Sequence, residues 1–326
     1  TSIVSFAGGD VPFGTKLLFS CMELPEFTFA AEICEDLWAP LPPSVFHTAA
    51  GASVIVNLSA SDELVGKAEY RRQLVSGQSA RLVCGYLYAD AGEGESTTDL
   101  TFAAHNLIAE NGILLAENRY QTGTLTITEL DVDRIAAERR KMTTYPAVSS
   151  DDYLTVSFSL QNELTTLTRP IDTLPFIPQG ANADETFEEI LTIQMQGLKK
   201  RITHAHAQTA VVGISGGLDS ALALLVAVRA MDALDRPRSD VHAITMPCFG
   251  TTTRTKSNAS ALCEALGVPV QTIDIKHAVD VHFADIGHDP DIHDVTFENS
   301  QARERTQILM DYANRQNGLV IGTGDL

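Results

Sequence analysis

The hydrophobic pattern divides the chain into two stretches in which strands alternate with turns and helices. In the first stretch, Asn111-Gly112 is a hairpin turn signal between two apolar runs. The strand-like runs of this stretch are 27–34, 53–58, 82–87, 100–108, 113–117 and 125–130. Residues 143–182 carry four prolines and few long periodic runs. We therefore interpret them as a linker between a domain at 1–142 and a second domain at 183–326.

The second stretch has the order of elements that is typical of a parallel sheet. A long helix is predicted from Asp184 to about His204, with acids in its first turn and bases in its last. Strands follow at 210–214, 241–246, 270–275 and 319–322, and helices at 219–230, 254–266 and 298–316. This alternation predicts an α/β fold with helices on both faces of the sheet. We expect the ligand at the carboxyl ends of the strands.

One turn of the second stretch has the composition of a phosphate site. The apolar run that ends at Ile214 leads into Ser215-Gly-Gly-Leu-Asp-Ser220 and then into an apolar helical run. Backbone N–H groups and the positive end of a helix both favour an anion there, and two glycines let the backbone approach it. Asp219 is unfavourable beside a phosphate unless a cation such as Mg²⁺ bridges the two. The alternative is an ordinary glycine-rich turn; a Walker loop is excluded because no Gly-Lys-Ser/Thr follows.

A candidate nucleophile stands in the first stretch. Cys34 ends the strand predicted at 27–34, and Glu35-Asp-Leu-Trp-Ala-Pro40 breaks that strand. A thiolate held there can attack an amide carbonyl if a base and an ammonium group are nearby. Spacing alone, however, favours a buried structural cysteine.

Composition excludes several classes of partner. A net charge of −19 argues against nucleic acid and against an anionic membrane, and no apolar run is long enough to span a bilayer. Five cysteines without CxxC spacing fit the reduced thiols of a cytoplasmic protein. The histidines and aspartates between His282 and Asp294 match no closed zinc set, and we interpret them as a lid loop.

Several motifs resemble known families. The turn at 215–220 resembles the PP-loop of ATP pyrophosphatases, which release pyrophosphate and leave an adenylated substrate. The segment at 32–44 resembles the nucleophile segment of nitrilase-family amidases, as do 57–61 and 86–100. Both sites in this order resemble the glutamine-dependent NAD(+) synthetase family. Further segments with this resemblance are 246–250, 296–303 and 321–326.

The resemblance implies a fold and a first reaction. It implies a partial nitrilase-like α-β-β-α sandwich, followed by a Rossmann-like parallel-sheet PP-loop domain. Cys34 would attack the side-chain amide of glutamine and release ammonia, leaving a thioester for water to hydrolyse. Ser61, Lys67 and Trp38 would hold the glutamine, although Lys67 also fits a solvated surface lysine. In this family the glutamate and lysine that assist the cysteine precede it, and we expect them before Thr1.

The resemblance also implies the second reaction and its site. ATP adenylates nicotinic acid adenine dinucleotide, and ammonia then converts the adenylate to NAD⁺ and AMP. The expected ATP-binding residues are Gly213, Ile214, Ser215, Gly216, Gly217, Leu218, Asp219, Ser220 and Thr323, with Mg²⁺ on Asp219. Asn299 and Arg303 would contact the dinucleotide, although Arg303 also fits a surface helix charge.

The resemblance gives two further expectations, and the sequence is compatible with two other functions. The family is expected to complete the synthetase site with an acidic residue beyond Leu326 and to form a homo-oligomer. The alternative functions are another PP-loop glutamine amidotransferase and a catalytically incomplete ATP-binding fragment.

Overall fold

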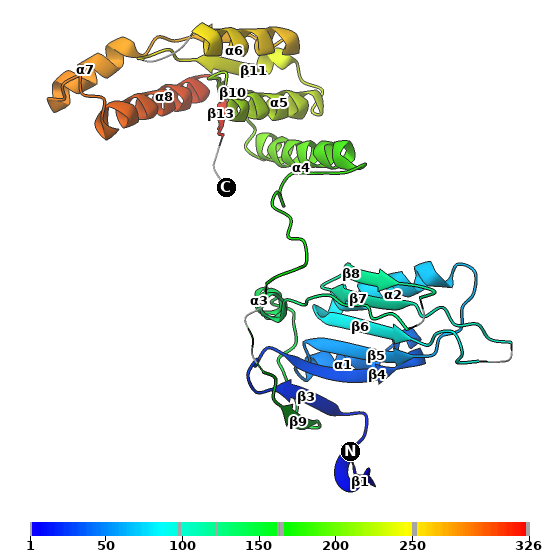
Figure 1. Cartoon of the computed structure of the whole chain (residues 1–326). Coiled ribbons are helices and arrows are strands. Elements are labelled where there is room, and N and C mark those ends of the chain that lie inside the picture. Colours follow the sequence, from blue (N-terminus) through cyan, green and yellow to red (C-terminus); the bar gives the residue numbers. More distant parts are fainter. Residues whose placement is uncertain are drawn as a thin grey trace. The chain divides into compact units, whose positions relative to one another are not determined.

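The chain forms two compact units, Thr1–Asp172 and Thr173–Leu326 (Figure 1). The computed structural model describes residues 2–96, 99–121, 123–161, 163, 166–249 and 253–323, and for 253–257 the backbone only. Within these ranges, no helix combines the length and the apolar character needed to cross a membrane.

The first unit is built on a seven-stranded mixed sheet in the order β8-β7-β6-β5-β4-β3-β9. The strands of this sheet are β3 (Leu17–Cys21), β4 (Thr28–Ile33), β5 (Val54–Ser59), β6 (Gly85–Asp90), β7 (Asn106–Glu110), β8 (Ile113–Asn118) and β9 (Leu154–Phe158), and β1 (Ser2–Phe6) and β2 (Gly9–Phe13) form a separate antiparallel pair. Its helices are the 3₁₀ helix η1 (Cys34–Trp38), α1 (Pro43–Ala49), α2 (Lys67–Leu82) and α3 (Val132–Lys141). β4, β5 and β6 pair in parallel, whereas β7 and β8 form the antiparallel hairpin predicted at Asn111-Gly112.

The core of this unit lies on one face of the sheet. Val75 and Leu82 of α2 pack there with Tyr86 of β6 and Leu107 of β7. Because side chains alternate along a strand, the intervening positions face the other way. On that side the side chains of Ile33 and Leu58 are 66% and 61% exposed.

Parts of the first unit differ from the sequence prediction, since the strands predicted at 82–87 and 100–108 begin only at Gly85 and Asn106. Inside the segment predicted as a linker, β9 pairs in parallel with β3, and Phe158 of β9 packs edge-on against Phe27 and Phe29. Five residues among prolines are too short a signal for such a strand to be recognised. The strand predicted at 125–130 was wrong, because these residues form no regular structure.

A partly buried arginine links three segments of the first unit. Arg139 of α3 donates hydrogen bonds to the carbonyl oxygens of Val83 (2.8 Å), Ala52 (2.8 Å) and Leu82 (3.3 Å). Arg139→Met should lower the free energy of unfolding by about 2 kcal/mol, because buried acceptors lose their donor. Urea denaturation measures this, with exposed Arg140→Met as the control. Equal losses in the two variants would contradict this role of Arg139.

The second unit is a four-stranded parallel sheet in the order β12-β11-β10-β13. Its strands are β10 (Thr209–Gly213), β11 (Val241–Thr245), β12 (Val270–Thr272) and β13 (Gly318–Ile321). Its helices are α4 (Ala183–His204), α5 (Leu218–Asp232), the 3₁₀ helix η2 (Arg238–Asp240), α6 (Thr253–Leu266), α7 (Lys276–Ile286) and α8 (Val295–Arg315).

Two clusters of buried side chains cover the two faces of this sheet. Ala210 and Val212 of β10 pack with Leu224 of α5, whereas Val211 packs on the other face with Phe283 of α7 and Phe297 of α8. The predicted parallel sheet with helices on both faces is therefore confirmed.

The strand order positions a ligand site. The chain leaves β10 toward β11 and β12 on one side, and then returns to place β13 on the other side of β10. The strand order therefore reverses at β10, and the carboxyl ends of the strands at such a point are where open α/β sheets bind ligands.

Candidate functional site

The glycine turn after β10 has the backbone geometry expected of an anion site. Gly216 has φ +84°, which favours glycine, and α5 begins immediately afterwards with Gly217 as its N-cap. Gly213 is needed for packing, since a Cβ there would lie 2.8 Å from Leu309 Cδ1 of α8. The N-terminal end of a buried, apolar helix is thus presented at the carboxyl end of the sheet.

Two serines fix the shape of this turn. The N–H of Gly217 donates to Ser215 Oγ (3.2 Å), and Ser220 Oγ donates to the Gly217 carbonyl (3.0 Å). The two hydroxyl oxygens are 3.1 Å apart. Hydrogen bonds from the turn's own side chains therefore stabilise its conformation.

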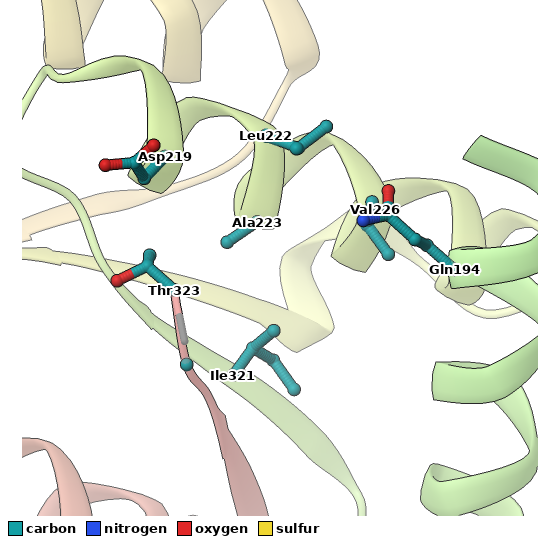
Figure 2. Close-up of a pocket in the computed structure, with 8 residues that line it drawn as sticks. Gln194, Asp219, Leu222, Ala223, Val226, Ile321 and Thr323 are labelled. Atoms are coloured by element: carbon teal, nitrogen blue, oxygen red, sulfur yellow. The ribbon is translucent and has the colours of Figure 1, made fainter. Parts of the chain in front are cut away.

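A cavity of about 210 Å³ lies between α4, α5 and the end of β13, and Asp219 is the residue of the turn that lines it. Asp219 and Thr323 lie at one end of this cavity, and Gln194 of α4 lies at the other (Figure 2). Asp219 is exposed in the first turn of α5, and the N-cap of that helix uses no side chain. The structure thus brings together two predicted ATP-site residues that are far apart in the sequence. Gln194 had no local signal in the sequence beyond its position on a helix.

The predicted dinucleotide residues lie elsewhere in the second unit. Asn299 and Arg303 are exposed on α8, one turn apart and on one face of that helix. Neither lines the cavity beside Asp219. Their contact with a dinucleotide stays a prediction.

The segment predicted as a lid loop is helical in its first part, up to Ile286. His282 and Asp285 lie on α7, while Asp294 caps α8 by accepting from the N–H groups of Thr296 (2.8 Å) and Phe297 (3.0 Å). Within the described part of the chain, no three histidine, cysteine or acidic side chains are grouped to hold a metal ion.

Cys34 is the first residue of η1, directly after β4, where the sequence predicted the strand to break. It is partly exposed and has φ +48°, an unfavourable backbone conformation for a residue with a Cβ. It lines a cavity of about 310 Å³. The lining residues are Cys34, Glu35, Trp38, Ala60, Ser61, Asp62 and Lys67. All four residues predicted for the glutamine reaction therefore share one pocket.

The pocket carries charges of both signs. Lys67 Nζ donates to Asp62 Oδ1 (2.8 Å) and to the Asp62 carbonyl (2.7 Å). The hydrogen bond from Lys67 lowers the pKa of Asp62. Glu35 and Asp62 were missed by the sequence analysis, since exposed acids are common on any surface. The pocket can accordingly contact both a carboxylate and an ammonium group.

The remaining wall of the pocket is held rigidly. The N–H of buried Ser61 donates to Asp90 Oδ1 (2.9 Å), and its Oγ accepts from Arg71 Nη2 (3.2 Å). The Trp38 ring packs against the Tyr88 ring at 5.9 Å between centroids. Burial raises the pKa of Asp90, while the N–H of Ser61 and Arg71 oppose that shift.

Comparison with known proteins bears on both sites. Residues 190–326 match the NAD synthase family. Over 99% of its length, the chain is 41% identical to the glutamine-dependent NAD(+) synthetase of Mycobacterium tuberculosis, covering 50% of that protein. The chain belongs to the glutamine-dependent NAD(+) synthetase family. It is also 42% identical to the same synthetase of Mycobacterium leprae, over 97% of this chain and 48% of that protein.

A shorter relative has a different name. The NH(3)-dependent NAD(+) synthetase of Trichlorobacter lovleyi is 34% identical over 39% of this chain and 44% of its own length. The chain spans about half the length of the curated glutamine-dependent NAD(+) synthetases that it matches. In this chain, the residues that match the NAD synthase family include the glycine turn and α8 but not the Cys34 pocket.

Proposed function

We propose that this chain contributes the amidase nucleophile and the ATP-binding turn of a glutamine-dependent NAD(+) synthetase. The observation that carries the proposal is the presence of the Cys34 pocket and the Ser215–Ser220 turn in one chain that is 41% identical to such a synthetase along 99% of its length. The overall reaction would form NAD⁺ from nicotinic acid adenine dinucleotide, ATP and glutamine, releasing AMP and pyrophosphate.

In the first site, Cys34 would attack the glutamine side-chain amide. The C–N bond breaks, the departing amide nitrogen takes up the proton that the thiol has lost and leaves as ammonia, and the resulting thioester is hydrolysed by water to glutamate. Lys67 would contact the α-carboxylate of glutamine, with Asp62 and Glu35 near its α-ammonium group. Trp38 and Ser61 would form the walls. The support is that these residues line one cavity with the thiol.

In the second site, the turn at 213–220 would hold the ATP phosphates, with Thr323 beside it. The carboxylate of the dinucleotide, contacted by Asn299 and Arg303, attacks the α-phosphorus and pyrophosphate leaves. Ammonia then displaces AMP to form the amide. Activation is required because a carboxylate is a poor electrophile.

The donor chemistry of the second site fits Mg²⁺. One exposed carboxylate at the turn, that of Asp219, leaves the remaining coordination positions to phosphate oxygens and water, which is the arrangement that Mg²⁺ prefers. Bound there, the ion would neutralise charge on the leaving pyrophosphate.

The same proposal covers the organisation of the protein. We propose that residues 1–142 form part of a nitrilase-like α-β-β-α sandwich, that 143–182 connect the domains, and that 183–326 form part of a PP-loop domain. The apolar, exposed outer face of the first sheet, at Ile33 and Leu58, supports a second layer over that face. Five cysteines without a disulfide fit a cytoplasmic protein, and we propose in addition that the protein forms a homo-oligomer.

Product analysis by mass spectrometry of the full-length protein tests this proposal. NAD⁺ and AMP should appear only when ATP, nicotinic acid adenine dinucleotide and an ammonia source are all present. Glutamine should replace ammonium as that source. Formation of another amide product under these conditions would overturn the proposal.

Lys67→Met should raise the KM for glutamine by about tenfold or more, because a charge-assisted contact with the substrate carboxylate is lost. The KM for ammonium should stay unchanged. Steady-state kinetics with each nitrogen donor measure both values. Lys141→Met is the matched control, because Lys141 is an exposed lysine paired with Glu138 (2.8 Å) away from the pocket. An unchanged glutamine KM in Lys67→Met would remove this residue from the site.

A further inference from the structure

The backbone of Cys34 needs support from its surroundings. Its φ of +48° lies in the left-handed region, which residues with a Cβ adopt at a cost. Such a conformation persists where neighbouring groups hold it. The side chains that contact the Cys34 backbone therefore determine where the thiol points.

Asn57 of β5 makes two hydrogen bonds to this backbone. The N–H of Cys34 donates to Asn57 Oδ1 (3.1 Å), and Asn57 Nδ2 donates to the Cys34 carbonyl (3.4 Å). The Asn57 side chain is buried. One amide thus satisfies both polar groups of the strained residue.

A buried chain of donors fixes which way this amide is turned. Asn57 Nδ2 donates to the hydroxyl of Tyr86 (3.2 Å), and that hydroxyl donates to the Glu32 carboxylate. The carboxylate also accepts from the N–H of Ser44 (2.8 Å) in the first turn of α1. Because the phenol gives its only proton to Glu32, it can receive only a donor from Asn57. The opposite amide orientation would place Oδ1 against the Cys34 carbonyl and is therefore disfavoured.

The environment keeps this order of donors in place. Glu32, Tyr86 and Asn57 are all buried, so exchange of these partners with bulk water is limited. Burial raises the pKa of Tyr86 most, and the adjacent Glu32 raises it further. The phenol therefore stays protonated and able to donate.

We propose that Asn57, oriented by Tyr86 and Glu32, is the positioning residue for the Cys34 nucleophile. The inference rests on the proposed glutamine reaction and deepens it. None of the three side chains lines the Cys34 cavity, so they would act through the backbone of Cys34 and not by touching the substrate.

Tyr86→Phe is the sharpest test, since it removes one hydroxyl and keeps the ring. In the full-length protein, the kcat for glutamine-driven synthesis should fall by about tenfold to a hundredfold, as expected for a slightly misplaced reacting group. The KM for glutamine should change less than about twofold, because the contacts that bind glutamine in the pocket are unchanged. Ammonium-driven synthesis should be unchanged. Asn57→Asp, which keeps the acceptor for the Cys34 N–H and loses both donors, should give at least as large a loss of kcat.

The control is Tyr145→Phe in the same unit. Tyr145 also donates a partly buried hydrogen bond, to the Leu82 carbonyl (3.1 Å), but has no contact with the Asn57 network. It should keep the glutamine-driven rate. Equal rate losses in Tyr86→Phe and Tyr145→Phe, or a loss in Tyr86→Phe that also affects ammonium-driven synthesis, would overturn the inference.

A crystal structure of Asn57→Asp beside the wild type gives a readout that is independent of turnover. The Cys34 φ angle should leave the left-handed region in the variant, and an unchanged angle would overturn the inference. Failure of the proposed function has a different signature: wild-type protein would not use glutamine, or Cys34→Ala would still use it. Glutamine-driven rates equal to the wild type in both Tyr86→Phe and Asn57→Asp, with Cys34→Ala inactive, would overturn the positioning role alone.

Discussion

Replacing Cys34 with alanine should abolish glutamine-driven synthesis of NAD⁺ and leave ammonium-driven synthesis at the wild-type rate. The thiol of Cys34 lines the first pocket, whereas Cys21, Cys84 and Cys263 are buried. Without the sulfur no thioester forms, and the loss should reach at least about a thousandfold, as for other enzymes that lack their nucleophile. Added ammonium should bypass this step because, in the proposed mechanism, the adenylate is formed in the other unit.

Paired rate measurements on one preparation check this expectation. NAD⁺ is quantified with glutamine and with ammonium chloride as alternative donors. Cys21→Ala serves as the control, because it removes a different thiol from the same unit and should keep both rates. Normal use of glutamine by Cys34→Ala would show that another residue is the nucleophile.

The second unit was predictable from sequence because its signals are local and mutually consistent. Apolar runs of strand length alternate with helical runs, and the predicted strand at 210–214 differs from β10 by one residue at each end. The first part of the lid loop predicted between His282 and Asp294 instead belongs to α7, which ends at Ile286. Val279 and Phe283 are buried four residues apart on that helix, a spacing that the intervening histidines and aspartates obscured.

The first unit shows where a local pattern misleads. Leu125 and Ile127 alternate with polar residues as in a strand, yet their side chains are 82% and 77% exposed and the segment pairs with no strand among the described residues. Alternation marks a strand only if a partner strand is available, and pairing across a sheet is not encoded within five residues. β9 presents the reverse case, with a real partner in β3 and a weak local signal.

Some features of the candidate sites likewise follow from local sequence, whereas others depend on the three-dimensional fold. The position of Cys34 and the composition of the glycine turn follow from short stretches of sequence. The meeting of Asp219 with Thr323, and of Cys34 with Ser61, Asp62 and Lys67, depends on which strands are neighbours. The Glu32-Tyr86-Asn57 network could not be read from spacing at all, since its members come from three different strands.

The Asp219 carboxylate should prove essential for synthesis and dispensable for folding. It lies in the first turn of α5 without capping that helix, so Asp219→Asn loses only a favourable charge at the helix N-terminus, worth about 0.3–1 kcal/mol. The melting temperature should therefore fall by no more than a few degrees. Asp232→Asn, at the other end of the same helix, is the control for loss of a carboxylate in the activity and ATP-binding assays, because Asp232 pairs with Arg238 (2.8 Å) and lines no part of the cavity beside Asp219.

Synthesis by Asp219→Asn should be lost with glutamine and with ammonium alike, because both routes need the adenylate. A neutral amide cannot hold a hard cation against the pyrophosphate as a carboxylate does. Calorimetric titration with ATP, with Mg²⁺ and then with EDTA, should show Mg²⁺-dependent binding in the wild type and in Asp232→Asn, and none in Asp219→Asn. Full ammonium-driven activity in Asp219→Asn would exclude the metal role and leave this carboxylate as a helix-terminal charge alone.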